Sequence, residues 1–143
     1  MSAAAVEVRT AELTVTETHV VSWANLTGDW LPIHMSAEHA RESSFGERLV
    51  HGPLTMALAI GLSTRTPVID PVLTRAWLGL RDLRAVAPVF IGDTIHAVVS
   101  IAGERPAKDP EQSVVELSYT VRNQRAETVM TFLNVVLVDS ARQ

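Results

Sequence analysis

The stretch GPLTMALAIGLST, residues 52–64, is the part of the sequence that decides the fold. Pro53 suits the first position of a helix, and the residues after it predict a helix from Pro53 to about Thr64 without a polar stripe. A helix that is apolar nearly all round is stable in water only when other structure encloses it. At about 1.5 Å per residue it would be roughly 18–20 Å long. We therefore expect the rest of the chain to wrap around this helix.

The second half of the chain supplies strands for such a wrapping. Apolar and polar residues alternate over residues 94–101 and 115–122, which is typical of antiparallel strands with one buried face. Residues 73–85 and 127–138 indicate two further strands, and the second is apolar on both faces, as expected near a sheet centre or an interface. The sequence predicts an α+β fold in which a strongly curved antiparallel sheet is wrapped around a central buried helix.

The first half is predicted to be helical and rich in loops. A short strand is expected over Leu13–Thr16, followed by a helix that Thr16 or Thr18 can cap and that should end at Thr27-Gly28. The irregular stretch after it contains one short helix over residues 36–42, with the serine at its start as the cap.

Length and composition indicate one folded domain over residues 1–143. A chain of 143 residues can bury roughly 68–70% of the surface that it exposes when unfolded. With 47% hydrophobic and 20% charged residues the chain is not of the disordered class, and its apolar stretches are too short and interrupted to span a bilayer. We expect no membrane partner.

Charge and cysteine content exclude several classes of function. Twelve basic against sixteen acidic residues give a net charge of −4, which argues against nucleic acid as a partner. The absence of cysteine excludes disulfides, thiol nucleophiles and thiolate zinc sites, so catalysis must use oxygen and nitrogen groups. Residues 1–10 do not resemble a secretory signal, and the expected location is the cytoplasm.

Asp29 and His34 are the first candidates for chemistry. On a fully extended chain they would lie about 17 Å apart, but Gly28 and Pro32 favour a bend that could bring them together. A carboxylate beside an imidazole can hold and activate one water molecule. The pair by itself is a weak signal, because Asp29 could simply cap a turn and His34 could be a surface residue.

Gly52 is the candidate for binding a substrate oxygen. The first amides of a helix have no intrahelical acceptor, so the Gly52 N–H could polarise a carbonyl, although Gly52 could also be a plain helix cap. The neighbouring His51 could contact a ligand, but it is interpreted as a structural histidine that bonds to nearby backbone.

No metal site is predicted. His34 and His39 do not have the i, i+4 spacing of a helical metal pair, and no nearby carboxylate completes a triad with them and His51. Eleven of the twelve basic residues are arginines, whose forked guanidinium groups suit phosphate groups. No individual arginine is predicted as a site residue.

The combined motifs resemble a known family. The run Thr27-Gly28-Asp29-x-x-Pro32-x-His34, then Phe45-Gly46 and Leu49-Val50-His51-Gly52 before the apolar helix, resembles the MaoC-like hydratases and dehydratases, including (R)-specific enoyl-CoA hydratases. The resemblance extends from about Leu13 to Val138, with residues 87–94 and 121–124 resembling later parts of the family pattern. It implies a hot-dog fold.

The resemblance also implies an activity, the reversible addition of water to a 2-enoyl thioester to give a 3-hydroxyacyl thioester. Asp29 and His34 would match the catalytic pair, and the Gly52 amide would bind the thioester oxygen. No metal or redox cofactor is called for, since coenzyme A or phosphopantetheine enters as part of the substrate. Leu31 stands where family members commonly have asparagine, and Ile60 where they often have a small polar residue.

Two other functions remain as alternatives. A hot-dog thioesterase often has a catalytic carboxylate on the central helix, and residues 52–67 contain none. A non-catalytic or partner-dependent subunit that binds acyl thioesters typically lacks the Asp/His pair, which this chain has. Exposed sheet edges favour pairing, so we expect a homodimer with the substrate channel at the subunit boundary, or a heterodimer with another hot-dog subunit.

Overall fold

The computed structural model describes residues 6–141. Its elements in chain order are β1 (Val8–Arg9), β2 (Leu13–Thr14), α1 (Glu17–Thr27), α2 (Pro32–Met35), α3 (Ala37–Glu42), α4 (Gly52–Ser63), β3 (Thr74–Ala85), β4 (Thr94–Pro106), β5 (Gln112–Arg122) and β6 (Thr128–Asp139). No helix in the described part of the chain has both the length and the apolar character needed to cross a bilayer.

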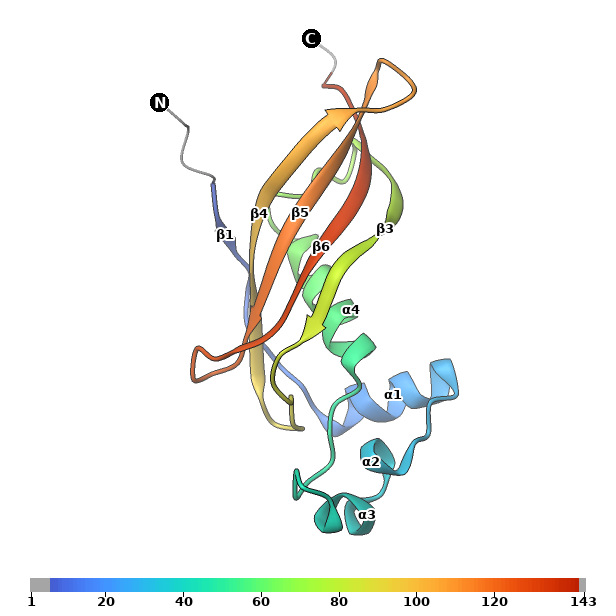
Figure 1. Ribbon diagram of the computed structural model, residues 1–143, viewed down its shortest axis with the longest axis vertical. Coiled ribbons are helices and arrows are strands. Elements are labelled where there is room, and N and C mark those ends of the chain that lie inside the picture. The colour runs from blue at the N-terminus through green and yellow to red at the C-terminus, as the bar shows by residue number, and fades with distance from the viewer. Residues whose placement is uncertain (1–5, 142–143) are drawn as a thin grey trace.

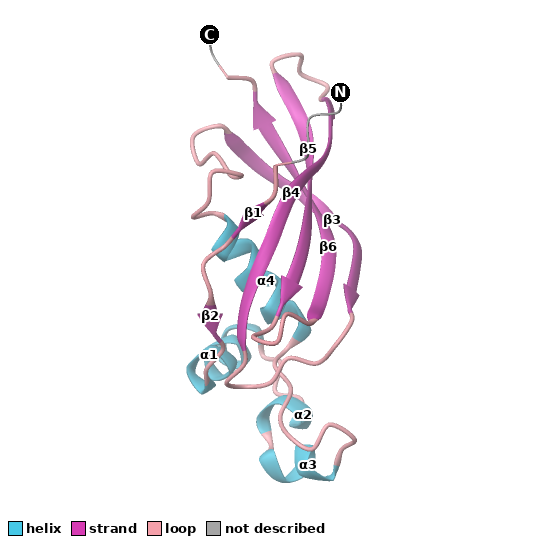
Figure 2. Ribbon diagram, turned by 90° about the vertical axis from the view of Figure 1, so that its left-hand side faces the viewer, coloured by secondary structure: helices cyan, strands magenta, loops and turns pink. Residues whose placement is uncertain are grey.

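One curved antiparallel sheet forms the main layer. Its strand order is β1-β4-β5-β6-β3, and β2 pairs with β4 off this path. The four long strands twist together, and α4 lies along one face of the sheet (Figures 1 and 2). The predicted α+β architecture, a curved sheet around one helix, is confirmed.

The core lies between α4 and the inner face of the sheet. Leu54 and Ala59 of α4 are buried there with the inward residues of the central strands, among them Ile95, Leu117 and Val121. The predicted alternation holds along β5, but on β4 it stops before Ile101, which is 53% exposed. A register irregularity between β4 and β5 begins at Ile101, and the hairpin beyond it projects past the helix (Figure 1).

The second face of α4 is only partly covered. Met56, Leu58 and Ile60 are half-buried, so within one chain the sheet encloses one side of the helix rather than all of it. Trp30 and Trp77 are also exposed, at 54% and 62%, and are not core residues.

The predicted boundaries of α1 are confirmed. Thr16 is its N-cap, and at its C-terminal end Gly28 adopts a left-handed φ of 78° while its N–H donates to the Ala24 carbonyl at 2.8 Å. The strand before it is shorter than predicted and ends at Thr14, because Thr16 already caps the helix.

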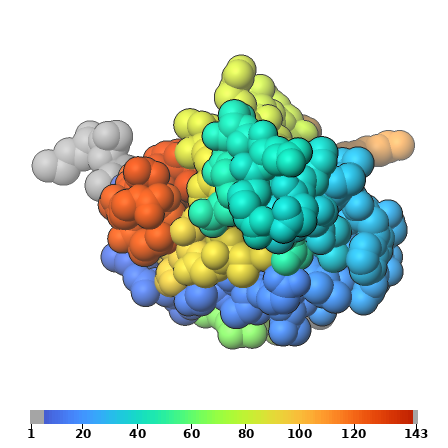
Figure 3. All heavy atoms as spheres, turned by 90° about the horizontal axis from the view of Figure 1, so that it is seen from below, coloured from blue at the N-terminus to red at the C-terminus, as the bar shows by residue number. Residues whose placement is uncertain are grey.

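The stretch after α1 contains one more helix than the sequence predicts. Pro32 starts the single turn of α2, where a proline is favoured because its missing N–H would have no helical acceptor. Ser36 caps α3 as expected, its Oγ accepting a hydrogen bond from the His39 N–H at 3.2 Å. Seen from below, these segments and those around residue 90 form one end of the molecule (Figure 3).

Candidate active site

Two chain segments come together at the N-terminal end of α4. The Leu49 N–H donates to the Ile33 carbonyl at 3.1 Å, and Arg48 Nε donates to the His34 carbonyl at 2.6 Å. Arg48 also forms an ion pair with Glu17 of α1, at 2.7 Å. These contacts fasten the α2 turn against the segment that leads into α4, and they leave the Arg48 guanidinium engaged rather than free to bind a phosphate.

Asp29 and His34 meet across a short gap. One carboxylate oxygen of Asp29 and one ring nitrogen of His34 lie within 4.8 Å of each other, and both side chains are half-buried. The structure gives no direct hydrogen bond between them. A separation of this size suits two polar groups that share a bridging water molecule. The bend at Gly28 and the α2 turn thus bring together the two residues that the sequence paired.

The tautomer of His34 follows from its partner. His34 Nδ1 lies 2.8 Å from the Leu49 carbonyl oxygen, which can only accept, so Nδ1 carries the proton. In the neutral ring Nε2 therefore carries the lone pair. This nitrogen is the one that can take a proton from water.

Gly52 lies beside this pair as the first residue of α4. Gly52 and His34 line the same cavity of about 350 Å³, whose other walls come mainly from apolar residues of the 85–89 segment and the start of β6. A Cβ added at Gly52 would meet no protein atom within 4 Å, so the glycine leaves open space next to its amide. That N–H has no acceptor within the helix.

A second cavity of about 360 Å³ lies further along α4. Its walls include Met56 and Ile60 of the helix, Trp77 of β3 and Asn134 of β6. Two polar groups at this wall bond to each other, since Trp77 Nε1–H donates to Asn134 Oδ1 at 2.8 Å. The cavity therefore presents a mostly apolar surface to a ligand.

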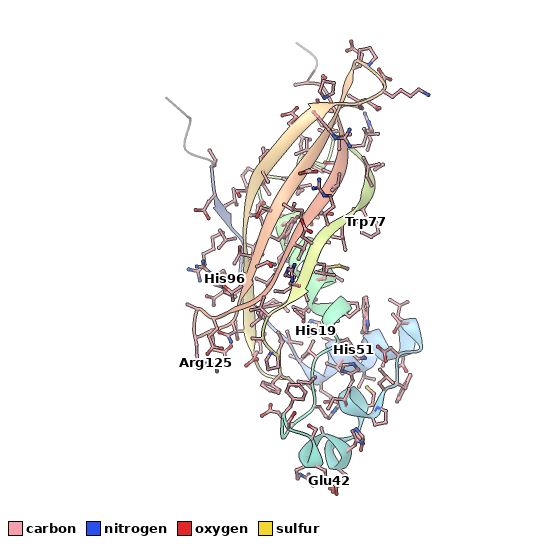
Figure 4. The ribbon with its side chains drawn as sticks, in the orientation of Figure 1. His19, Glu42, His51, Trp77, His96 and Arg125 are labelled. Carbon is pink, nitrogen blue, oxygen red and sulfur yellow. The ribbon has the colours of Figure 1, made fainter. Side chains whose placement is uncertain are left out.

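His51 makes one contact that the sequence predicted and one that it did not. It is fully buried, and its Nε2 donates to the backbone carbonyl of Asp29 at 3.0 Å, which matches the expected bond to nearby backbone. Its ring also stacks on His34, with centroids 4.0 Å apart and an interplanar angle of 26°. Figure 4 shows His51 near the start of α4. The pairing of this histidine with His34 has no signal in local periodicity, because it joins residues from two elements.

Of the three histidines considered for a metal site, the structure brings two together with Asp29 and leaves the third apart. Asp29, His34 and His51 offer ligand atoms within 4.8 Å of one another, whereas His39 is exposed on α3 and outside this group. A histidine binds a metal through a nitrogen lone pair that lies in the plane of its ring, at about 2 Å. The rings of His34 and His51 are stacked with a tilt of only 26°, so their nitrogen lone pairs cannot both point at one ion. The prediction of no metal site stays a prediction, now with this geometric reason.

Comparison with known proteins identifies relatives over most of the chain. The family model described as "MaoC like domain" matches residues 2–125. The chain is 33% identical over 91 residues to "3-hydroxyacyl-thioester dehydratase Z" of Mycobacterium tuberculosis, covering 64% of this chain and 60% of that protein. It is 31% identical over 96 residues to "(R)-specific enoyl-CoA hydratase" of Rhodospirillum rubrum, covering 66% and 63%. The chain thus spans less than two thirds of these curated relatives.

Solved structures share the fold. A "monoamine oxidase regulatory protein" from "Archaeoglobus fulgius" superposes with a TM-score of 0.90 at 31% identity, covering 96% of this chain and 91% of that one. A Mycobacterium tuberculosis protein described as having a double hotdog fold superposes with a TM-score of 0.84 at 17% identity, covering 99% of this chain and 43% of that one. The fold is therefore a hot dog, as the motifs implied.

Proposed function

The chain belongs to the MaoC like domain family, and from this premise we propose that it catalyses the reversible hydration of a 2-enoyl thioester to a 3-hydroxyacyl thioester. The (R) configuration of the product and a coenzyme A or acyl carrier protein thioester are part of the proposal. The observation that carries it is the gap of up to 4.8 Å between Asp29 and His34, beside the open amide of Gly52.

In the hydration direction the pair acts on water. The water bridges the Asp29 carboxylate and His34 Nε2, and its oxygen bonds to C3 as a proton leaves it. His34 Nε2 takes up the proton that leaves the water and then gives a proton to C2, so the elements of one water molecule are added across the double bond and the imidazole returns to its starting state. Asp29 orients the water and the imidazole, and the Nδ1–H bond to the Leu49 carbonyl keeps the His34 lone pair on Nε2.

Gly52 stabilises the charge that develops on the substrate. As C3 is attacked, negative charge moves to the thioester oxygen, and the Gly52 N–H donates to it at the positive end of α4. One such donor can supply about 3–4 kcal/mol of transition-state stabilisation. Proton transfer and this bond suffice for the chemistry, so the proposal names no metal or redox cofactor.

The neighbouring functions are less well supported. No carboxylate is present on α4, which disfavours a hot-dog thioesterase of the usual kind. A passive acyl-binding subunit has no need for an acid and an imidazole that share a water site. The proposed setting is the cytoplasm, since a chain without cysteine needs no oxidising compartment.

A panel of enoyl- and 3-hydroxyacyl-CoA substrates, read at the enoyl absorbance, tests the proposal. Purified protein should hydrate crotonyl-CoA without an added partner, and activity that appears only with a second hot-dog protein would instead indicate an obligate heteromer. Asp29→Asn and His34→Ala should each lower the rate by at least about 10²-fold, because positioned acid–base groups contribute on that scale. Unchanged thermal melts are the control, and near-normal turnover in either variant would refute the assigned roles.

A further inference from the structure

We infer that His51 is a positioning residue for this reaction: its Nε2–H bond to the Asp29 backbone sets the gap in which the water is held. The inference rests on the proposed function for its kinetic consequence, but its structural part can be tested without any activity.

Asp29 has few other constraints. Its N–H donates to Thr27 Oγ1 at 3.2 Å, and its Oδ1 accepts from the Leu31 N–H at 3.3 Å. Both partners are two residues away and belong to the same loop. Among the described residues, the bond from His51 at 3.0 Å is the hydrogen bond that ties Asp29 to another part of the fold. Without it, the loop can shift as a unit while its local bonds persist.

His34 is held from the opposite direction by the same segment. Its ring bonds to the carbonyl of Leu49, two residues before His51, and its carbonyl accepts from Arg48. His51 thus supports the Asp29 end of the loop, and Arg48 and Leu49 support the His34 end. Stacking of the two imidazoles at 4.0 Å joins the two ends. The distance between Asp29 and His34 is consequently set by residues 48–51.

The bonding requires opposite tautomers in the two stacked rings. His34 carries its proton on Nδ1, whereas His51 must carry its proton on Nε2 to donate to the Asp29 carbonyl. His51 Nδ1 is buried without a partner. A proton on Nδ1 would have no acceptor, whereas a proton on Nε2 has one in the Asp29 carbonyl.

Two variants separate the hydrogen bond from the ring. His51→Gln places an amide N–H near the position of Nε2 and removes the ring, whereas His51→Phe keeps a ring against His34 and removes the donor. If the bond positions Asp29, His51→Phe should lose about 10²-fold in kcat, the scale expected when a catalytic group is displaced by about 1 Å. His51→Gln should keep most of the wild-type kcat. KM for crotonyl-CoA should change little in either, because His51 does not line the cavity.

The kinetics of the two variants can support or overturn the proposal. Near-wild-type kcat in folded His51→Phe overturns it, and so does an equal loss in both variants at equal thermal stability, which would assign the effect to the ring. His39→Gln and His39→Phe on exposed α3 are the matched controls and should behave as wild type.

Nitrogen-15 NMR of the imidazoles in the wild-type protein is the second test, and it applies even if a variant does not fold. The expected signature is a slowly exchanging Nε2–H on buried His51 together with Nδ1–H on His34. A proton on His51 Nδ1 overturns the inference. If the wild type turns over no thioester in the panel, the proposed function fails, while the NMR result still decides whether His51 holds Asp29.

Discussion

In the proposed reaction, individual atoms at the start of α4 carry the chemistry. The helix begins with a glycine that lines a cavity, and the histidine before it bonds to the loop that carries Asp29. Neither residue is demanded by backbone strain: Gly52 has no left-handed φ and its missing side chain faces open space. The fold does not require a glycine at residue 52, and the proposed binding of the thioester oxygen supplies a reason for one.

This reasoning predicts that stability and activity separate in Gly52→Ala. Alanine fits the backbone and is the better helix former by up to about 1 kcal/mol, so the melting temperature should stay equal or rise. The new methyl group enters the space in which the thioester oxygen reaches the amide. We expect kcat/KM for crotonyl-CoA to fall by at least about 10²-fold, as on loss of an oxyanion donor.

Gly61→Ala is the matched control for this change. Gly61 lies on the same helix, has equally open space and does not line either large cavity. It should retain full activity. A Gly52→Ala enzyme as active as Gly61→Ala would show that the amide at residue 52 does not approach the substrate.

Helix α4 is the element along which the acyl chain of the proposed substrate would lie. Its first turn lines the cavity that holds His34, and its later turns line the second cavity against β3 and β6. Ile60 stands eight residues after Gly52, about 12 Å along the helix axis. Ser63, the last residue of α4, forms a hydrogen bond of 2.7 Å with the hydroxyl of Tyr119. Burial raises the pKa of the Tyr119 phenol, so the phenol stays protonated.

Truncation of Ile60 should shift the acyl-chain preference. Ile60→Ala enlarges the second cavity, and one methylene in an apolar pocket is worth roughly 1–3 kcal/mol. The ratio of kcat/KM for 2-octenoyl-CoA to that for crotonyl-CoA is expected to rise by about tenfold. Leu58→Ala, also half-buried on α4 but outside that cavity, controls for general loosening of the helix. An unchanged ratio would place the acyl tail elsewhere.

The sheet has an exposed edge strand at which a second copy of the chain could pair. Strand β3 ends the sheet, and its side chains Leu78 and Leu83 are 50% and 44% exposed. The residues that follow β3 line the cavity beside Gly52, so a second copy on this edge would lie next to the site. We therefore predict that the proposed homodimer forms along β3, because an uncovered strand edge with apolar side chains favours association.

Sedimentation analysis of Leu83→Lys tests this arrangement. A lysine at the edge should weaken the dimer, and the variant should sediment partly as monomer at concentrations at which the wild type is dimeric. Leu26→Lys, an 81% exposed residue at the end of α1, serves as the comparison. A wild-type protein that sediments as a monomer would refute the homodimer, and an unaffected Leu83→Lys dimer would exclude this edge.

Stability of the molecule should depend on pH through His96, which lies near the opposite edge of the sheet (Figure 4). Burial, and then the charges of Arg9 and Arg122, lower the pKa of His96, although Glu12 opposes them. Between this lowered value and the ordinary one of about 6.5, the unfolded chain binds more protons than the folded chain. The free energy of unfolding contributed by His96 is thus fully present above that range and is lost as the pH falls through it.

Thermal melts of His96→Gln measure this contribution. As the pH is lowered from about 7.5 to about 5, the melting temperature of the variant should fall less than that of the wild type, because glutamine cannot take up the proton. Parallel melting curves for the two proteins over this range would mean that His96 does not carry the effect.

Local sequence pattern was sufficient to predict the longer helices and strands. The apolar run of α4, the two-residue alternation of β5 and the Gly28 stop of α1 are all local consequences of side-chain period and backbone freedom, and each was predicted close to its observed place. The order of Asp29, His34 and Gly52 likewise identified the family and the residues of the candidate site. The α2 turn and the two-residue β1 were not predicted, because elements so short have no period to detect.

Contacts between distant segments needed the folded chain. The gap between Asp29 and His34, the stacking of His34 on His51, and the half-open face of α4 depend on which elements pack together. A residue pattern records which side of an element is apolar, but not which partner meets it. Hydrogen bonds such as that from His51 to Asp29 form across 22 positions of the chain, and only the closed structure brings their atoms within reach.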